Sequence, residues 1–123
     1  MSNEQEFQKA RALEDRQDFP GALSVYKKLV QGSGDPRHFI AYGVCLQRLS
    51  HWKQSIGPLQ QGIALKPHYC EGDARLFLAT AYFESGQKKK AIDQWRLVSQ
   101  MEPEYPSYDA VPDEAKRMLA KYA

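Results

Sequence analysis

Residues 75–103 read RLFLATAYFESGQKKKAIDQWRLVSQMEP, and this stretch decides the fold. Ala79 and Ala91 are small enough to let two antiparallel helices approach closely. Large side chains at matching positions fill the seam between those helices, namely Leu78, Tyr82 and Trp95. Pro103 then ends the second helix, because proline lacks the amide hydrogen that helical bonding needs. The stretch therefore predicts a pair of packed helices.

The same spacing recurs upstream. Gly43 lies 36 residues before Ala79, and Pro67 lies the same distance before Pro103. A weaker copy of the pattern begins near residue 3, with polar residues at several positions where large apolar ones are expected. A terminal repeat has one face in water, so it needs fewer apolar residues. The chain therefore holds three related units, of which the last two are the stronger.

This arrangement of large, small and aromatic residues, followed by a small residue, an aromatic one and proline, resembles the tetratricopeptide repeat family. The resemblance covers about residues 3–103, although Arg75 replaces the tryptophan that usually opens the motif. It implies an all-α fold, a right-handed solenoid of three antiparallel helix pairs plus a C-terminal capping helix. We expect a single domain over residues 1–123, with repeats at about 3–35, 36–69 and 72–105 and the cap at about 112–122.

Helices are expected near residues 3–16, 20–32, 36–49, 53–66, 72–85, 88–101 and 112–122. Pro58 falls inside the fourth of these, where a mid-helix proline costs roughly 3 kcal/mol, and it predicts a kink or a late start. Pro112 suits the first position of the last helix. Between the last two helices, Tyr105 and Tyr108 are expected to hold a proline-rich linker against the last repeat.

Composition narrows the range of functions. Seventeen basic and fifteen acidic residues leave a net charge of +2, which provides no electrostatic basis for binding nucleic acid or an anionic membrane. No apolar run is long enough to cross a bilayer. The first twenty residues are polar and acidic, so no signal peptide is expected. We therefore expect a cytoplasmic protein.

Candidate chemical groups are scattered. The three histidines, His38, His51 and His68, lie at no spacing that supports a metal or catalytic site. Cys45 and Cys70 show no metal or redox spacing and are expected to be inert thiols. No nucleophile or phosphate-binding motif occurs, and the lysines at 88–90 are expected to be an exposed helix start. We predict no catalytic residues, no metal and no cofactor.

A concave groove is the most informative feature that the resemblance implies, because the first helix of each pair lines the inner surface of such solenoids. The predicted peptide-binding residues are Phe7, Arg11, Arg37, Ile40, Val44, Gln47, Arg48, Asp73, Leu76, Thr80, Phe83 and Glu84, with the acidic Glu4, Glu14 and Asp15 beside them. A row of exposed apolar side chains is costly in water unless something covers it. The cover is either a partner or the neighbouring repeats and the last helix.

The resemblance implies a non-enzymatic protein-interaction module, such as a scaffold or adaptor, that binds a peptide or helix of a protein partner in this groove. One alternative is a small secretion or assembly chaperone built from the same repeats. Another is a structural subunit that self-associates through its ends. All three are protein-binding roles, and none involves nucleic acid or a membrane.

Overall fold

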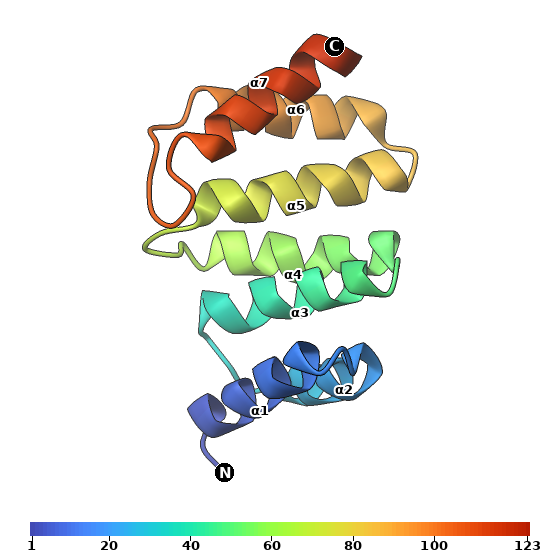
Figure 1. Ribbon diagram of the computed structural model, residues 1–123, viewed down its shortest axis with the longest axis vertical. Coiled ribbons are helices and arrows are strands. Elements are labelled where there is room, and N and C mark those ends of the chain that lie inside the picture. The colour runs from blue at the N-terminus through green and yellow to red at the C-terminus, as the bar shows by residue number, and fades with distance from the viewer.

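The computed structural model describes residues 1–123 as seven α-helices without a β-strand. The helices are α1 (Asn3–Asp15), α2 (Phe19–Leu29), α3 (Pro36–Arg48), α4 (Trp52–Ala64), α5 (Glu71–Glu84), α6 (Lys88–Ser99) and α7 (Ala110–Tyr122). In Figure 1 they succeed one another along the long axis, from α1 and α2 at one end to α7 at the other. Three packed helix pairs followed by a terminal helix confirm the predicted all-α repeat fold.

Local sequence signals fix the helix starts. The Ser2 hydroxyl accepts a hydrogen bond from the Gln5 amide at 3.1 Å, and the Gln5 side chain accepts one from the Ser2 amide at 2.9 Å. This reciprocal capping box satisfies two amides that the first turn of α1 leaves free. At the start of α3, the Asp35 carboxylate accepts from the Arg37 amide at 2.9 Å, and Pro36 is the first helical residue.

The turn inside each helix pair has the same backbone geometry. Gln17, Ser50 and Gly86 all have positive φ angles, of 62°, 59° and 85°. The residue after each donates its amide to a carbonyl five positions earlier, in the bonds Asp18 to Leu13, His51 to Leu46 and Gln87 to Tyr82. This is the Schellman arrangement that ends many helices with a left-handed residue. The repetition supports the three-unit pattern expected from the sequence.

Small residues allow the helices of a pair to pack closely. Ala79 and Ala91 are both fully buried, as predicted for the seam of the third pair. Gly43 has the equivalent role in the second pair, since a Cβ atom there would lie 2.6 Å from Cγ of Leu59. Leu59 is itself completely buried and could not retreat without disturbing its neighbours. The small residues are therefore required by the close approach of the helices.

Buried side chains form two separate groups. The C-terminal cluster contains Leu59, Leu78, Ala79, Tyr82, Ala91, Trp95, Val98, Val111 and Ala115. The N-terminal cluster contains Phe7, Ala10, Ala22, Tyr26, Leu29 and Cys45. Helix α7 adds two members to the C-terminal cluster, and its Met118, Leu119 and Tyr122 pack against it. The last helix thus covers the end of the stack, as predicted for a cap.

Two proline predictions need correction. Helix α4 starts at Trp52 and continues through Pro58, so the late start is wrong. The missing amide removes one helical bond, and packing of α4 between α3 and α5 maintains the helix. Helix α7 begins at Ala110, so Pro112 is its third residue and not its first. An amide there would lack an intrahelical partner in any case, so proline is tolerated.

The linker between α6 and α7 is held differently from the prediction. Its tyrosines do not bury themselves on the last repeat, because Tyr105 and Tyr108 are 57% and 56% exposed. Backbone and serine contacts fix the linker instead. The Cys70 amide donates to the Tyr105 carbonyl at 3.2 Å, and the Ser107 hydroxyl donates to the Asp73 carboxylate at 2.5 Å. The linker is therefore tied to the start of α5.

Candidate binding cleft

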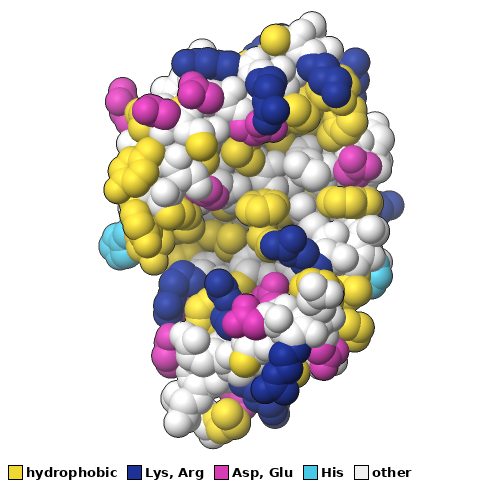
Figure 2. Space-filling view, viewed as in Figure 1, with side chains coloured by type: hydrophobic (Ala, Val, Ile, Leu, Met, Phe, Trp, Pro, Cys, Tyr) yellow, Lys and Arg dark blue, Asp and Glu magenta, His cyan; other side chains and the backbone are white.

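An open cleft of about 970 Å³ lies between α1 and α3. It arises because α1 packs against α2 and α2 packs against α3, which leaves the flank of α1 that faces α3 uncovered. The space-filling view shows a hollow with apolar side chains inside it and charged ones around it (Figure 2). The lining residues are Phe7, Gln8, Arg11, Glu14, Asp15, Gln17, Phe19, Arg37, Ile40, Ala41, Val44, Arg48, Tyr69, Cys70, Tyr105 and Pro106.

The floor of the cleft is apolar. Ile40, Ala41 and Val44 from α3 are only half-buried, so part of each faces the open space. Ile40 is fixed from behind, since a Cβ atom on Gly62 of α4 would lie 2.7 Å from its Cγ1. Phe7 of α1 closes the opposite side and is itself almost fully buried. A ligand would meet preformed aliphatic surface here.

Arg37 joins the two walls of the cleft. One of its terminal nitrogens lies 3.1 Å from the Glu4 carboxylate of α1 and 2.7 Å from the Asp35 carboxylate. The guanidinium carbon lies 5.2 Å from the centroid of the Phe7 ring. Hydrogen bonding from Arg37 lowers the pKa of Asp35, which keeps this carboxylate ionised. The charge of Arg37 is therefore shared with the protein's own carboxylates and has a structural role.

His38 lies beneath the same contact. Its ring is buried and lies 4.8 Å from the Phe7 ring, measured between centroids. Nδ1 is 2.7 Å from the Ser33 hydroxyl, whereas Nε2 has no hydrogen-bond partner. Burial lowers the pKa of His38, so the imidazole is neutral at pH 7. The neutral ring packs against Phe7 where α1 meets the start of α3.

Charges of both signs surround the floor. Arg11 and Arg48 form no ion pair within the protein, so their charges remain available to a ligand. Of the opposite sign, Asp15 and Glu14 line the cleft from α1. The buried Tyr26 hydroxyl donates to the Glu14 carboxylate and holds it in place. Burial and this hydrogen bond raise the pKa of Tyr26, so the phenol stays protonated and remains a donor.

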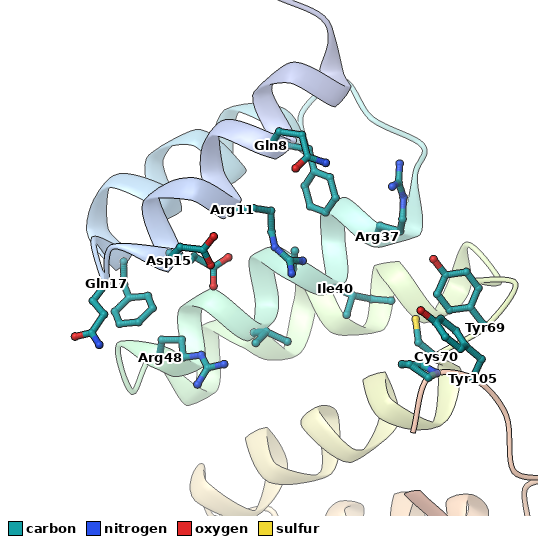
Figure 3. Close-up of a pocket in the computed structure, with 16 residues that line it drawn as sticks. Gln8, Arg11, Asp15, Gln17, Arg37, Ile40, Arg48, Tyr69, Cys70 and Tyr105 are labelled. Atoms are coloured by element: carbon teal, nitrogen blue, oxygen red, sulfur yellow. The ribbon is translucent and has the colours of Figure 1, made fainter. Parts of the chain in front are cut away.

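Two loops form the far wall. Tyr69 and Cys70 precede α5, while Tyr105 and Pro106 belong to the linker before α7. In Figure 3 the labelled Tyr69, Cys70 and Tyr105 face Ile40 across the cavity. The two tyrosine rings meet edge to face, with centroids 5.2 Å apart and planes at 77°. Segments more than thirty residues apart in sequence therefore share this wall.

The cleft ends where α3 meets α5. The Gln47 side-chain amide donates to the Phe77 carbonyl at 2.8 Å and to the Ser55 hydroxyl at 3.2 Å, so it bridges helices. Beyond this contact, Thr80 donates to the Leu76 carbonyl of its own helix at 3.1 Å. These side chains are occupied by contacts within the protein.

The third repeat is covered by the C-terminal helix. Phe83 contacts Tyr122 of α7, with ring centroids 4.6 Å apart and planes tilted by 51°, and its ring centroid also lies 5.9 Å from that of Trp95. Leu76 packs against the C-terminal cluster. Tyr122 therefore occupies the place that a ligand would need in order to reach Phe83.

Half of the predicted groove residues line the cleft and half do not. Those that line it are Phe7, Arg11, Arg37, Ile40, Val44 and Arg48. Those outside it are Gln47, Asp73, Leu76, Thr80, Phe83 and Glu84. The cleft is also lined by Gln8, Gln17, Phe19 and Ala41 and by the four loop residues, none of which belongs to the predicted set. The helical positions follow from the repeat frame, but no periodicity indicates which loops meet.

The geometry offers little support for a metal site or a reactive thiol. No three His, Cys, Asp or Glu side chains gather in a way that could hold a metal ion. Both cysteines are free, and burial raises the pKa of Cys45 to about 12 and that of Cys70 above its usual value. Neither thiol is therefore activated as a nucleophile. No helix has both the length and the apolar content to cross a bilayer.

No protein-family model matches the chain, and no curated protein matches it in sequence. Solved structures do resemble it in fold. The type III secretion chaperone SycD of Yersinia enterocolitica, in complex with a peptide of the translocator YopD, matches with a TM-score of 0.84 at 19% identity. That match covers 97% of this chain and 90% of SycD.

Two other proteins extend the comparison. PcrH, in complex with the chaperone binding region of PopD, has a TM-score of 0.85 at 18% identity over 97% of this chain and 89% of its own. Another structure of PcrH, from Pseudomonas aeruginosa, has a TM-score of 0.83 at 18% identity over 98% of this chain and 90% of its own. MamA has a TM-score of 0.74 at 20% identity over 98% of this chain and 76% of its own. At such low identity these likenesses show that the fold is shared.

Proposed function

We propose that this protein is a non-enzymatic peptide-binding module that holds an apolar segment of a partner protein in the cleft between α1 and α3. The observation that carries the proposal is the half-exposed aliphatic floor of Ile40, Ala41 and Val44 at the bottom of an open cleft. Exposed apolar surface of this kind is stabilised when a complementary chain covers it.

The size and lining of the cleft favour a short extended segment. Ligand sites typically enclose about 300–1,000 Å³, and this cleft lies at the upper end of that range. Aliphatic side chains of the ligand would meet the floor, while the unpaired Arg11 and Arg48 would meet acidic groups of the ligand. Buried anchors should supply most of the affinity, and the exposed charges should mainly tune rate and selectivity.

A chaperone role is the more specific form of this proposal. SycD and PcrH share the fold, and their complexes contain a peptide of YopD and the chaperone binding region of PopD. By analogy, the protein would keep an apolar, aggregation-prone segment of a secreted or assembling partner covered until it is handed on. The groove residues of the first two repeats would do this, and those of the third repeat would support the fold.

Self-association is the second candidate. SycD has been crystallised as an alternative dimer, so the fold is compatible with contacts between copies. In that case a second copy would cover exposed apolar residues, which include Leu97 on α6 and Phe77 on α5. A dimer in light scattering that survives substitution of the cleft floor would favour this role.

Selection from a phage-displayed library of random dodecapeptides tests the proposal without knowledge of the partner. We expect wild-type protein to enrich peptides with aliphatic anchors, and Val44→Asp to lose at least about tenfold in affinity for them, because a carboxylate would be desolvated on the cleft floor. Leu97→Asp is the matched control, since this exposed α6 residue lies outside the cleft. Equal loss in both variants, or no enrichment, would contradict the proposal.

A further inference from the structure

The loop wall of the cleft carries an exposed pair of tyrosines that the proposed function does not explain. Tyr69 and Tyr105 are 44% and 57% exposed. An edge-to-face contact covers only part of the two rings, so aromatic surface remains open toward the cleft (Figure 3). Tyr105 also meets Tyr108 edge to face, with centroids 6.4 Å apart, which gives Tyr105 a second aromatic neighbour.

This aromatic wall is held in place and is not a loose loop tip. The Cys70 amide donates to the Tyr105 carbonyl, and the Ser107 hydroxyl donates to the Asp73 carboxylate. The first bond joins the loop before α5 to the linker before α7, and the second joins the same linker to the first turn of α5. A preorganised aromatic surface loses little conformational entropy when a ligand binds to it.

The linker that carries Tyr105 is acidic. Residues 101–109 contain Glu102, Glu104 and Asp109 and no basic residue. After burial, the charges of Asp73 and Glu104 are what raise the pKa of Cys70, so their field reaches this wall. Aromatic faces beside carboxylates favour a cation, because the ring quadrupole and the acidic groups act in the same direction.

The protein's own cations do not occupy this site. Its cation–π contacts lie over other rings, with Arg11 and Arg37 over Phe7, Lys90 over Tyr82 and Lys121 over Tyr122. The opposite wall carries Arg11 and Arg48 together with the carboxylates of Glu14 and Asp15, so its charge is mixed. The exposed tyrosine rings belong only to the loop wall, so the two ends of the cleft differ in chemistry.

We propose that Tyr69 and Tyr105 form a recognition site for a lysine or arginine side chain of the peptide held in the cleft. This inference rests on the proposed peptide-binding function and adds a direction to it. The basic residue of the ligand lies at the loop wall, and its aliphatic anchors lie over Ile40 and Val44. Proline in the ligand would also pack on tyrosine rings, but it would gain nothing from the surrounding carboxylates.

The test uses the tightest peptide from the library selection, labelled with fluorescein and measured by anisotropy. Each lysine or arginine is replaced in turn by norleucine, which keeps the aliphatic stem and removes the charge. At one position we expect wild-type protein to bind about threefold to fivefold more weakly, as a surface cation–π contact would predict. In Tyr105→Leu that preference should disappear, while the norleucine peptide binds both proteins almost equally.

Charge variants complete the test. Glu104→Gln should reduce the preference for the basic residue, whereas Glu102→Gln, in the same linker, should leave it unchanged. If selected peptides lack a basic residue, or if the norleucine penalty persists in Tyr105→Leu, the aromatic site is refuted and peptide binding stands. If no peptide binds in a manner sensitive to Val44→Asp, the proposed function fails and this inference fails with it.

Discussion

The surface formed by α1, α3 and α5 differs between its two ends, although the same repeat pattern builds both. At the α1/α3 end, α3 presents Ile40 and Val44 to an open cleft. At the α5/α7 end, Leu76 and Thr80 occupy the matching positions of α5 and lie outside the cleft, and Phe83 of the same helix contacts Tyr122 of α7. The difference comes from the cover that each helix pair receives. Tyr122 of α7 covers the last pair, whereas no element covers the inner flank of the first. Equivalent repeat positions thus need not line the same cavity, even where both are half-buried.

The largest expected effect tests whether the covered end forms the stabilising core. Trp95 is 1% exposed, and its ring lies 5.9 Å from that of Phe83 and 5.8 Å from that of Tyr122, measured between centroids. Trp95→Ala should lower the free energy of unfolding by about 3–5 kcal/mol, since it removes a large buried side chain and leaves a cavity. Urea denaturation measures this. Trp52→Ala is the control, because Trp52 is only half-buried and belongs to neither cluster; equal losses would refute the distinction between the regions.

A second prediction concerns a substitution that fills the open cleft with a side chain. Ala41 lies 36 residues before Phe77, so the two occupy matching positions of successive units. Ala41→Phe should place a phenyl ring in the cleft and weaken peptide binding at least tenfold, or about 1.4 kcal/mol, with little effect on stability. Anisotropy titration and thermal melting separate the two effects. Unchanged affinity in a folded variant would mean that peptides bind elsewhere.

A third prediction concerns the pH dependence of stability, and it involves His38 at the α1/α3 end. Burial lowers the pKa of His38 below 6.5, so the unfolded chain binds a proton first as the pH falls. The free energy of unfolding should therefore decline below about pH 6.5 until the folded-state pKa is reached. The slope for one proton is at most about 1.4 kcal/mol per pH unit.

The carboxylates near His38 change the stability of the protein only at lower pH. Asp35, Arg37 and Glu4 are the charged groups that act on His38, and the pKa values of Asp35 and Glu4 are lowered. Their contributions disappear only in more acidic solution, so measurements between about pH 5 and pH 7.5 isolate the histidine. His38→Gln should flatten the slope and the exposed control His51→Gln should retain it. A slope that survives in His38→Gln would contradict the assignment.

The smallest expected effect compares the turns of the three helix pairs. Ser50 has a φ of 59°, a conformation that costs a residue with a side chain about 1 kcal/mol, whereas the matching residue in the third pair is Gly86. Ser50→Gly should therefore raise the free energy of unfolding by about 1 kcal/mol. The reciprocal Gly86→Ser should lower it by a similar amount, and thermal melting measures both. A loss of stability in Ser50→Gly, or a gain in Gly86→Ser, would show that the turns are not equivalent.

Much of the fold could be predicted from spacing alone. The positions of Ala79, Ala91 and Trp95 reflect how closely two helices must approach, and this constraint is local to one repeat. The cleft residues on α3 could be predicted from the same frame. That α7 covers Phe83 could not be predicted, because this depends on where α7 lies. The position of α7 is set by the linker before it, through contacts such as that of Ser107 with Asp73.

The loop wall of the cleft also could not be predicted from the sequence. Tyr69 and Tyr105 lie in segments without periodicity, and their contact results from the bond between the Cys70 amide and the Tyr105 carbonyl. Helix periodicity describes which side of a helix is buried, but it carries no information about which loops meet. Exposed tyrosines in two unrelated turns therefore resemble ordinary surface residues until the fold brings them together.

We propose that a peptide binds between α1 and α3 and not over α5. Methyl NMR spectra of the protein, recorded during titration with a selected peptide, distinguish these two places. Large shift changes are expected for the methyl groups of Ile40 and Val44, with those of Leu76 and Val98 unchanged; this pattern would support the proposed binding place. Changes at Leu76 without changes at Ile40 and Val44 would contradict it.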